Sequence, residues 1–315
     1  MKESAAPGGW QVAVAQPDRL GESPFWHPHE RLLYWVDIPA LQLRRCDVAG
    51  GAVESWAMTS EPGCIAPAAS GGLVIALRDG IYRARSWGGD VRCIARFSHD
   101  PATTRFNDGK ADPMGRMWAG TLYEPRDAHN AKLYSVDCRP NNGNGGQPLI
   151  ELKAQDAITA NGLAWSPDQQ TVYWSDTPNH VIRAWNWDAT SNAMGNPRVF
   201  QQFPGKPADW QPGDGSYGGR PDGAAVDVEG NYWCAMYEGG RLLQFSPAGE
   251  LLQDIQVPAM CPTMPCFGGD DLRTLYLTSA RDKRPVAELE RLPNSGCVLS
   301  MRVEVKGLPV NFFID

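Results

Sequence analysis

The chain has 315 residues, a formal net charge of −7, and 12 tryptophans, 33 glycines and 26 prolines. Its length allows a large buried core, and its acidic balance without a basic stripe argues against a nucleic-acid partner, because phosphate backbones are bound by clustered Lys and Arg. No run approaches the roughly 20 apolar residues of a membrane span, and residues 1–9 lack the apolar core of a signal peptide. These features predict a soluble, cytoplasmic protein.

Short apolar runs separated by turn residues follow one another along the whole chain, and no long helix is predicted. We expect six units of four short strands, at residues 22–47, 66–84, 107–137, 161–188, 222–250 and 262–280. One strand start in each unit recurs at intervals of roughly 40 to 60 residues, which is typical of propeller blades. These starts are Tyr34, Val74, Met117, Tyr173, Tyr232 and Leu275.

The predicted fold class is therefore all-β, a six-bladed β-propeller. Two short strands, at residues 12–15 and 297–305, lack partners within the units. Pairing the N-terminal strand with the C-terminal strand in one blade would close the ring and remove two exposed sheet edges. We expect residues 1–9 to form a flexible N-terminus and residues 10–315 to form a single propeller domain.

Two insertions interrupt the repeat. Residues 141–148 are polar and glycine-rich and predict a surface loop. Residues 203–219 end directly before Arg220 and Asp222, and the sequence leaves two interpretations open: a lid over a site, or an ordinary solvated loop.

The eight cysteines are dispersed, contain no C-x-x-C pair and are predicted to be reduced. Cys261 and Cys266, which are flanked by prolines, are the pair for which the sequence leaves a disulfide or an oxidation site open. Their spacing is not typical of a zinc site.

A polar residue begins four of the units: Glu22, Asn107, Asn161 and Asp222. Because the innermost strands of a propeller converge on one channel, we expect these side chains to meet at one mouth. Two carboxylates and two amides form an oxygen set that suits Ca²⁺, Mg²⁺ or Mn²⁺ better than a structural zinc. Taken singly, each of these residues is also ordinary at an exposed position or a turn.

Four other aspartates are assigned to turns, because Asp-x-x-Gly and related patterns serve hairpins without any ligand. They are Asp108, Asp112, Asp168 and Asp227. The five histidines have no histidine partner at metal-binding spacing and are left out of the predicted site.

The residues around these positions resemble the SMP-30/gluconolactonase/regucalcin family of six-bladed propellers. Five motifs carry the resemblance, in order and over nearly the whole chain. They are GESPFW (21–26), RFNDGKADPMGRMWAGTL (105–122), NGLAWSPD (161–168), PDGAAVDVEGNYW (221–233) and LYLTSAR (275–281).

The resemblance implies a lactonase with one divalent metal ion, which opens the lactone ring of a sugar acid such as glucono-, xylono- or arabinolactone. It implies Glu22, Asn161 and Asp222 as metal ligands, with Asp222 also activating the attacking water. The implied substrate contacts are Arg105, Asn107 and, as the nearest match to a further family carboxylate, Glu124. The metal is left open among Ca²⁺, Mn²⁺, Mg²⁺, Zn²⁺ and Fe²⁺.

Two other functions remain open on the same scaffold, because propellers host many activities. One is a non-catalytic calcium-binding regulatory propeller, which would bind the cation without turnover. The other is a phosphotriesterase-like hydrolase, which an apolar pocket without Arg105-type donors would favour.

Overall fold

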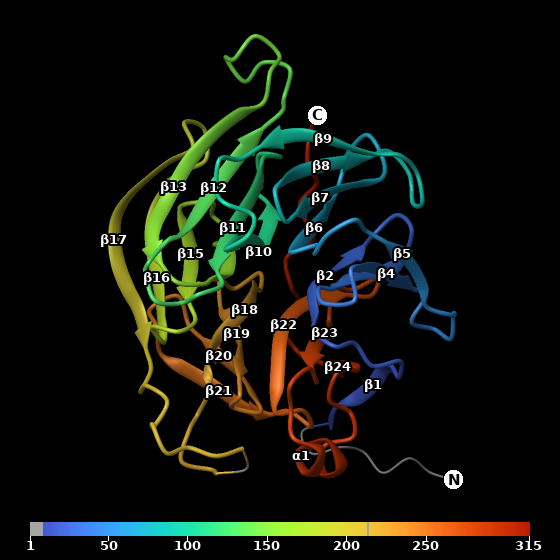
Figure 1. Ribbon diagram of the computed structural model, residues 1–315, viewed down its shortest axis with the longest axis vertical. Helices are drawn as coiled ribbons and strands as arrows, with labels where there is room; N and C mark the ends of the chain where they lie inside the picture. Colours follow the sequence, from blue (N-terminus) through green and yellow to red (C-terminus); the bar gives the residue numbers. More distant parts are fainter. Residues whose placement is uncertain (1–8, 213) are drawn as a thin grey trace.

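The computed structural model describes residues 9–212 and 214–315. Its 24 strands form six four-stranded antiparallel sheets, which stand as blades around a central axis (Figure 1). The helix α1 (Val286–Arg291) is the only α-helix in these ranges. The predicted all-β, six-bladed propeller is confirmed.

The strands of each blade run from the axis outward. The first strands are β2 (Gly21–His27), β6 (Cys64–Pro67), β10 (Thr104–Ala111), β14 (Ala160–Trp165), β18 (Arg220–Val226) and β22 (Cys261–Gly268). The second strands are β3 (Leu32–Asp37), β7 (Leu73–Leu77), β11 (Met117–Tyr123), β15 (Thr171–Asp176), β19 (Tyr232–Tyr237) and β23 (Thr274–Ala280). All six predicted strand starts fall in the second strands.

The third strands are β4 (Gln42–Cys46), β8 (Gly80–Ala84), β12 (Ala131–Asp137), β16 (Val181–Asp188), β20 (Arg241–Phe245) and β24 (Val298–Arg302). The outermost strands are β5 (Glu54–Ala57), β9 (Val91–Arg96), β13 (Leu149–Ala157), β17 (Ala193–Gln202), β21 (Leu251–Gln256) and β1 (Gln11–Val14).

The ring closes where the N-terminal strand β1 pairs antiparallel with β24, and Gln11 lies opposite Ser300. Because β24 also pairs with β23, the last blade contains both the first and the last strand of the described chain. The predicted closure is therefore confirmed, and it leaves no unpaired terminal strand.

Two of the predicted turn aspartates also anchor the blade core. The Nε1 of Trp118 donates to the carboxylate of Asp112 at 2.9 Å, and the Nε1 of Trp233 donates to Asp227 at 2.9 Å. The same carboxylates accept backbone N–H groups of their own turns. A hydrogen bond to a charged group contributes about 1.5–3 kcal/mol, so each acid joins a hairpin turn to a buried indole.

The remaining sequence-level expectations concern cysteines and loops. All eight cysteines are free thiols, and Cys261 and Cys266 are both buried in β22 without a disulfide. Residues 141–148 connect β12 to β13 as the predicted surface loop, which projects beyond the ring (Figure 1). Within the described ranges, no helix is long and apolar enough to cross a membrane.

Candidate metal and substrate site

A β-bulge lies in five of the six first strands, where each pairs with its second strand, and β6 pairs without one. The register shifts after Glu22 in β2 and after Asn161 in β14. In β10 and β18 the bulges contain Asn107 and Asp222. The four polar residues are therefore inside strands and not in turns, which corrects the turn interpretation. Bulges re-aim side chains, and here they do so at one end of the central axis.

All six predicted site residues line one cavity of about 740 Å³. Glu22, Asn107, Asn161 and Asp222 come from four different blades, and Arg105 and Glu124 come from the two ends of the β10–β11 hairpin. The convergence expected from the propeller geometry is thus present.

The two asparagines hold each other in a fixed orientation. The Nδ2 of Asn107 donates to the Oδ1 of Asn161 at 2.9 Å and to the carbonyl of Ala160 at 2.9 Å. The Nδ2 of Asn161 donates to the hydroxyl of Thr177 at 2.8 Å, and that hydroxyl donates to the carbonyl of Pro221 at 2.7 Å. The Asn161 oxygen keeps a free lone pair in a position that its neighbours determine.

Glu22 and Asp222 are buried carboxyl groups, each 6% exposed. Burial raises the pKa of Glu22 well above its usual range, and the nearby charges of Asp222 and Asp108 raise it further. Burial also raises the pKa of Asp222 well above its usual range, and the nearby charge of Asp108 raises it further. The charges of Arg220 and Arg126 lower this pKa by a smaller amount. Two anions are therefore unfavourable together in this cavity without a compensating charge.

Asp108 departs from the prediction that it is a turn residue. It lies in β10 at 3% exposure, next to the predicted site. Its Oδ2 accepts the backbone N–H of Leu163 at 2.9 Å, while its Oδ1 is buried without a hydrogen-bond partner among the described residues. Asp108 adds a third negative group close to Glu22 and Asp222, which the Asn-Asp-Gly pattern alone did not reveal.

This donor set fits a divalent cation. No group of three or more His, Cys, Asp and Glu side chains in the described part of the chain has metal-binding geometry. The predicted ligands are instead two carboxylates and one amide oxygen, which is a hard, oxygen-only set. Such a cation would offset the mutual repulsion of the buried acids. It would also compensate the Asp108 oxygen that has no hydrogen-bond partner among the described residues.

Arg105 lies beside the asparagines. Its Nη1 donates to the Oδ1 of Asn107 at 2.9 Å, and its Nε lies 4.0 Å from the carboxylate of Glu124. Burial lowers the pKa of Arg105 to about 10, so it stays charged at neutral pH. Arg78 holds Glu124 at 3.0 Å and Glu61 at 2.7 Å, which fixes both acids at the cavity wall.

A basic cluster at the rim was missed by sequence reasoning. Glu238 accepts ion pairs from Lys206 at 2.9 Å, Arg220 at 3.1 Å and Arg284 at 2.8 Å. Arg126 and Lys283 also line the cavity and are exposed, and no ion pair in the described ranges includes either of them. Only Arg220, directly before Pro-Asp-Gly, carried a sequence signal, because the others become neighbours through tertiary contacts.

The insertion at residues 203–219 is docked beside the cavity. None of its described residues lines the cavity, which favours the interpretation as a docked loop over that as a lid. Lys206 reaches the rim residue Glu238, and Trp210 and Tyr217 are both 6% exposed. The Tyr217 hydroxyl lies 2.6 Å from Nε2 of His180, whose Nδ1 lies 2.9 Å from the Pro178 carbonyl. The Nδ1–H therefore donates to this carbonyl, and Nε2 accepts from Tyr217.

We expect this loop to undock in mild acid. Burial lowers the pKa of His180 below its usual value of 6.5, and the Arg220 charge lowers it further. A histidine whose pKa is lower in the folded state stabilises the fold at pH values above its unfolded-state pKa. This stabilisation is lost as the pH falls through the folded-state pKa. The protection factors for amide hydrogen exchange in residues 203–212 and 214–219 should therefore fall as the pH drops below the usual histidine value of 6.5. A His180→Gln variant should lack this pH step; the same step in both proteins would contradict the assignment.

Comparisons with known proteins agree with this architecture. A family model described as the SMP-30/Gluconolactonase/LRE-like region matches residues 20–281. A 6-deoxy-6-sulfogluconolactonase from Pseudomonas putida is 43% identical over 297 residues, which cover 94% of this chain and 96% of the relative. Regucalcin from Gallus gallus is 33% identical over 300 residues, which cover 92% of this chain and 93% of that protein.

One solved structure gives the same result in three dimensions. It is described as a calcium-binding protein, regucalcin, from Agrobacterium tumefaciens, and it superposes with a TM-score of 0.86 at 25% sequence identity. The match covers 98% of both chains.

Proposed function

The chain belongs to the SMP-30/gluconolactonase/LRE-like family, and from this premise we propose that it is a divalent-metal-dependent lactonase that opens sugar-acid lactones. The observation that carries the proposal is the convergence of Glu22, Asn161 and Asp222 in one cavity with Arg105 and Asn107. The sulfogluconolactonase relative supports the reaction class, and the calcium-binding relative supports a divalent cation.

In this proposal Glu22, Asn161 and Asp222 hold the cation. When bound, the cation supplies Lewis acidity for the lactone carbonyl and favours deprotonation of water. Asp222 orients the attacking water and accepts its proton, since its carboxylate lies in the same cavity as the other proposed ligands. Asn107 keeps the Asn161 oxygen in place through its 2.9 Å hydrogen bond. Arg105 offers the remaining donors of its guanidinium to substrate oxygens.

The direct test is ring opening followed by acid release, on glucono-, xylono- and arabinolactone. Protein stripped of metal by a chelator should be inactive, and Ca²⁺, Mg²⁺, Mn²⁺ or Zn²⁺ should restore the rate. Cation binding without turnover on any lactone would favour a non-catalytic calcium-binding propeller. Turnover of a phosphotriester but no lactone would favour the other hydrolase.

The charges at the cavity rim favour a more specific substrate class, a sugar lactone that carries an anionic group. Arg126 and Lys283 place two unpaired positive charges at the cavity wall, in addition to the cations around Glu238. A sulfonate or another anionic group on the sugar, distant from the lactone ring bond, would pair with them. The 43% identical sulfogluconolactonase supports a sugar lactone with such a substituent.

The double variant Arg126→Gln/Lys283→Gln removes both rim cations. It should affect a sulfonated lactone more than an unsubstituted one. We expect kcat/KM for a 6-sulfonated gluconolactone to fall by about 10-fold or more, since each charged hydrogen bond contributes about 1.5–3 kcal/mol before solvent screening. The value for unsubstituted gluconolactone should change by less than about 3-fold. Equal losses on both lactones would contradict an anion-binding role. Arg92→Gln, on the exposed outer strand β9, is the matched control.

A further inference from the structure

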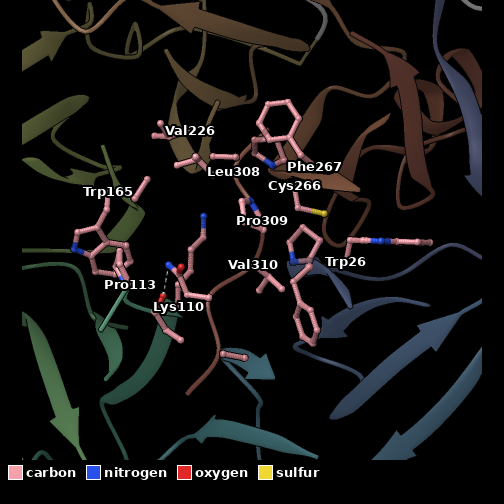
Figure 2. Close-up of a pocket in the computed structure, with 18 of the residues that line it drawn as sticks. Trp26, Lys110, Pro113, Trp165, Val226, Cys266, Phe267, Leu308, Pro309 and Val310 are labelled. Carbon is pink, nitrogen blue, oxygen red and sulfur yellow. Dashed lines mark hydrogen bonds between the residues drawn. The ribbon is translucent and has the colours of Figure 1, made fainter. Parts of the chain in front are cut away.

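A second cavity lies at the opposite end of the central axis. The first strands that carry the site residues continue into it, so that β10 presents Asn107 to one cavity and Lys110 to the other. This second cavity has a volume of about 280 Å³. Its walls are mainly aromatic and aliphatic, and the C-terminal segment 308–311 crosses them (Figure 2).

Lys110 is the one charged side chain among the cavity-lining residues. Figure 2 shows it extending from β10 toward the middle of a ring that includes Trp26, Trp165, Val226 and Leu308. Its Nζ donates one hydrogen bond, to the carbonyl of Ala224. An ammonium group has three N–H donors, so two of them have no acceptor within the described ranges.

The charge of Lys110 is not neutralised by direct contact. The described carboxylates lie beyond 4.0 Å from its Nζ, and Asp108 is the largest source of nearby negative charge. Burial lowers the pKa of Lys110, as expected for an ammonium group in apolar surroundings. A cation with free donors in such a cavity favours an anionic partner that has little other polarity.

We propose that this cavity binds a small monocarboxylic acid with an apolar body of roughly six to eight carbons, because its volume is near the lower end for small-molecule sites. The carboxylate accepts hydrogen bonds from Lys110, and the hydrocarbon body packs against Trp165, Leu308 and Val310. A sugar acid is excluded as the occupant, since its hydroxyl groups would lose their hydrogen bonds to water against an apolar wall. The Cys266 thiol in the wall is not a reactive thiolate, because burial raises its pKa to about 12.

Octanoate and octanol are the probes, since they share one hydrocarbon chain and differ in charge. Titration of the full-length protein should change the tryptophan emission, because Trp26 and Trp165 line the cavity. We expect octanoate to saturate the signal with a Kd below about 1 mM. Octanol should bind at least about 10-fold more weakly, because it lacks the charge-assisted hydrogen bonds.

Two variants separate the contributions of charge and space. Lys110→Met keeps the length of the side chain and should reduce octanoate affinity to that of octanol, with octanol affinity unchanged. Val310→Trp fills the cavity from the C-terminal segment and should weaken both probes, with an unchanged thermal transition. If Lys110→Met does not fold, the proposal is still tested by comparing octanoate with octanol on the wild type and by the Val310→Trp variant. Equal affinity for octanoate and octanol, no saturable binding, or unaltered binding in Val310→Trp would overturn the proposal.

Discussion

Replacing Asp222 by Asn should lower kcat for lactone opening by about 10²–10⁴-fold, the usual contribution of a general base. The amide keeps the shape of the side chain but accepts no proton and is a weaker metal ligand. The metal-free variant should nevertheless unfold at a higher temperature than the metal-free wild type at neutral pH. Burial raises the pKa of Asp222, so this group favours folding at acidic pH, and its contribution is lost as the pH rises through the folded-state pKa.

Asp227→Asn is the matched control, because it changes the other aspartate of the motif at residues 221–233. Asp227 is fully buried and accepts hydrogen bonds from Trp233 and Asn231 at 2.9 Å each. Its loss should destabilise the protein by about 1–3 kcal/mol per orphaned donor while leaving kcat of the folded fraction within about 3-fold. Activity and thermal unfolding of both variants are the measurements. A stability loss without a kcat loss in Asp222→Asn would remove Asp222 from the proposed chemistry.

The fold was predictable because its signals are local and repeated. A strand start such as Tyr173 or Tyr232 recurs in each blade, and the Asp-x-x-Gly turn before Trp118 and Trp233 marks the hairpin between the first two strands. Each blade buries the same kind of face against its neighbours, so one pattern specifies six similar sheets. The terminal strands without partners were informative as well, because they complete the last blade when they pair in it.

The site was only partly predictable. The polar residues Glu22, Asn107, Asn161 and Asp222 were found because they hold equivalent places in the repeat, although a turn and a bulge look alike in sequence. Asp108 was placed in a turn because Asn-Asp-Gly favours turns, and its burial depends on packing against β14.

The rim cations depend on residues that are far apart in the chain. Glu238 meets Arg220 across the β18–β19 hairpin, whereas Lys206 reaches it from the insertion and Arg284 from the segment after β23. The docking of Tyr217 on His180 likewise joins an insertion to the loop of another blade. None of these residues repeats from blade to blade, so periodicity gave no signal for them.

Arg105→Lys should lower kcat/KM for a sugar lactone by about 10- to 150-fold, which corresponds to one hydrogen bond to a charged group of about 1.5–3 kcal/mol. Lysine keeps the charge but loses the planar guanidinium, which in the wild type holds the Asn107 oxygen at 2.9 Å and offers further donors to the substrate. Because Asn107 in turn orients Asn161, part of the loss should appear as weaker cation binding in calorimetry.

Arg78→Lys is the control for this substitution. Arg78 forms ion pairs with Glu61 and Glu124 but does not line the cavity. We expect its kcat/KM to stay within about 3-fold of the wild-type value, because the carboxylates that it holds remain paired to a cation. If Arg105→Lys keeps the wild-type kcat/KM, Arg105 acts only through its charge at the cavity wall. A loss confined to Arg105→Lys, with weaker cation binding, places its guanidinium between the substrate and the metal ligands.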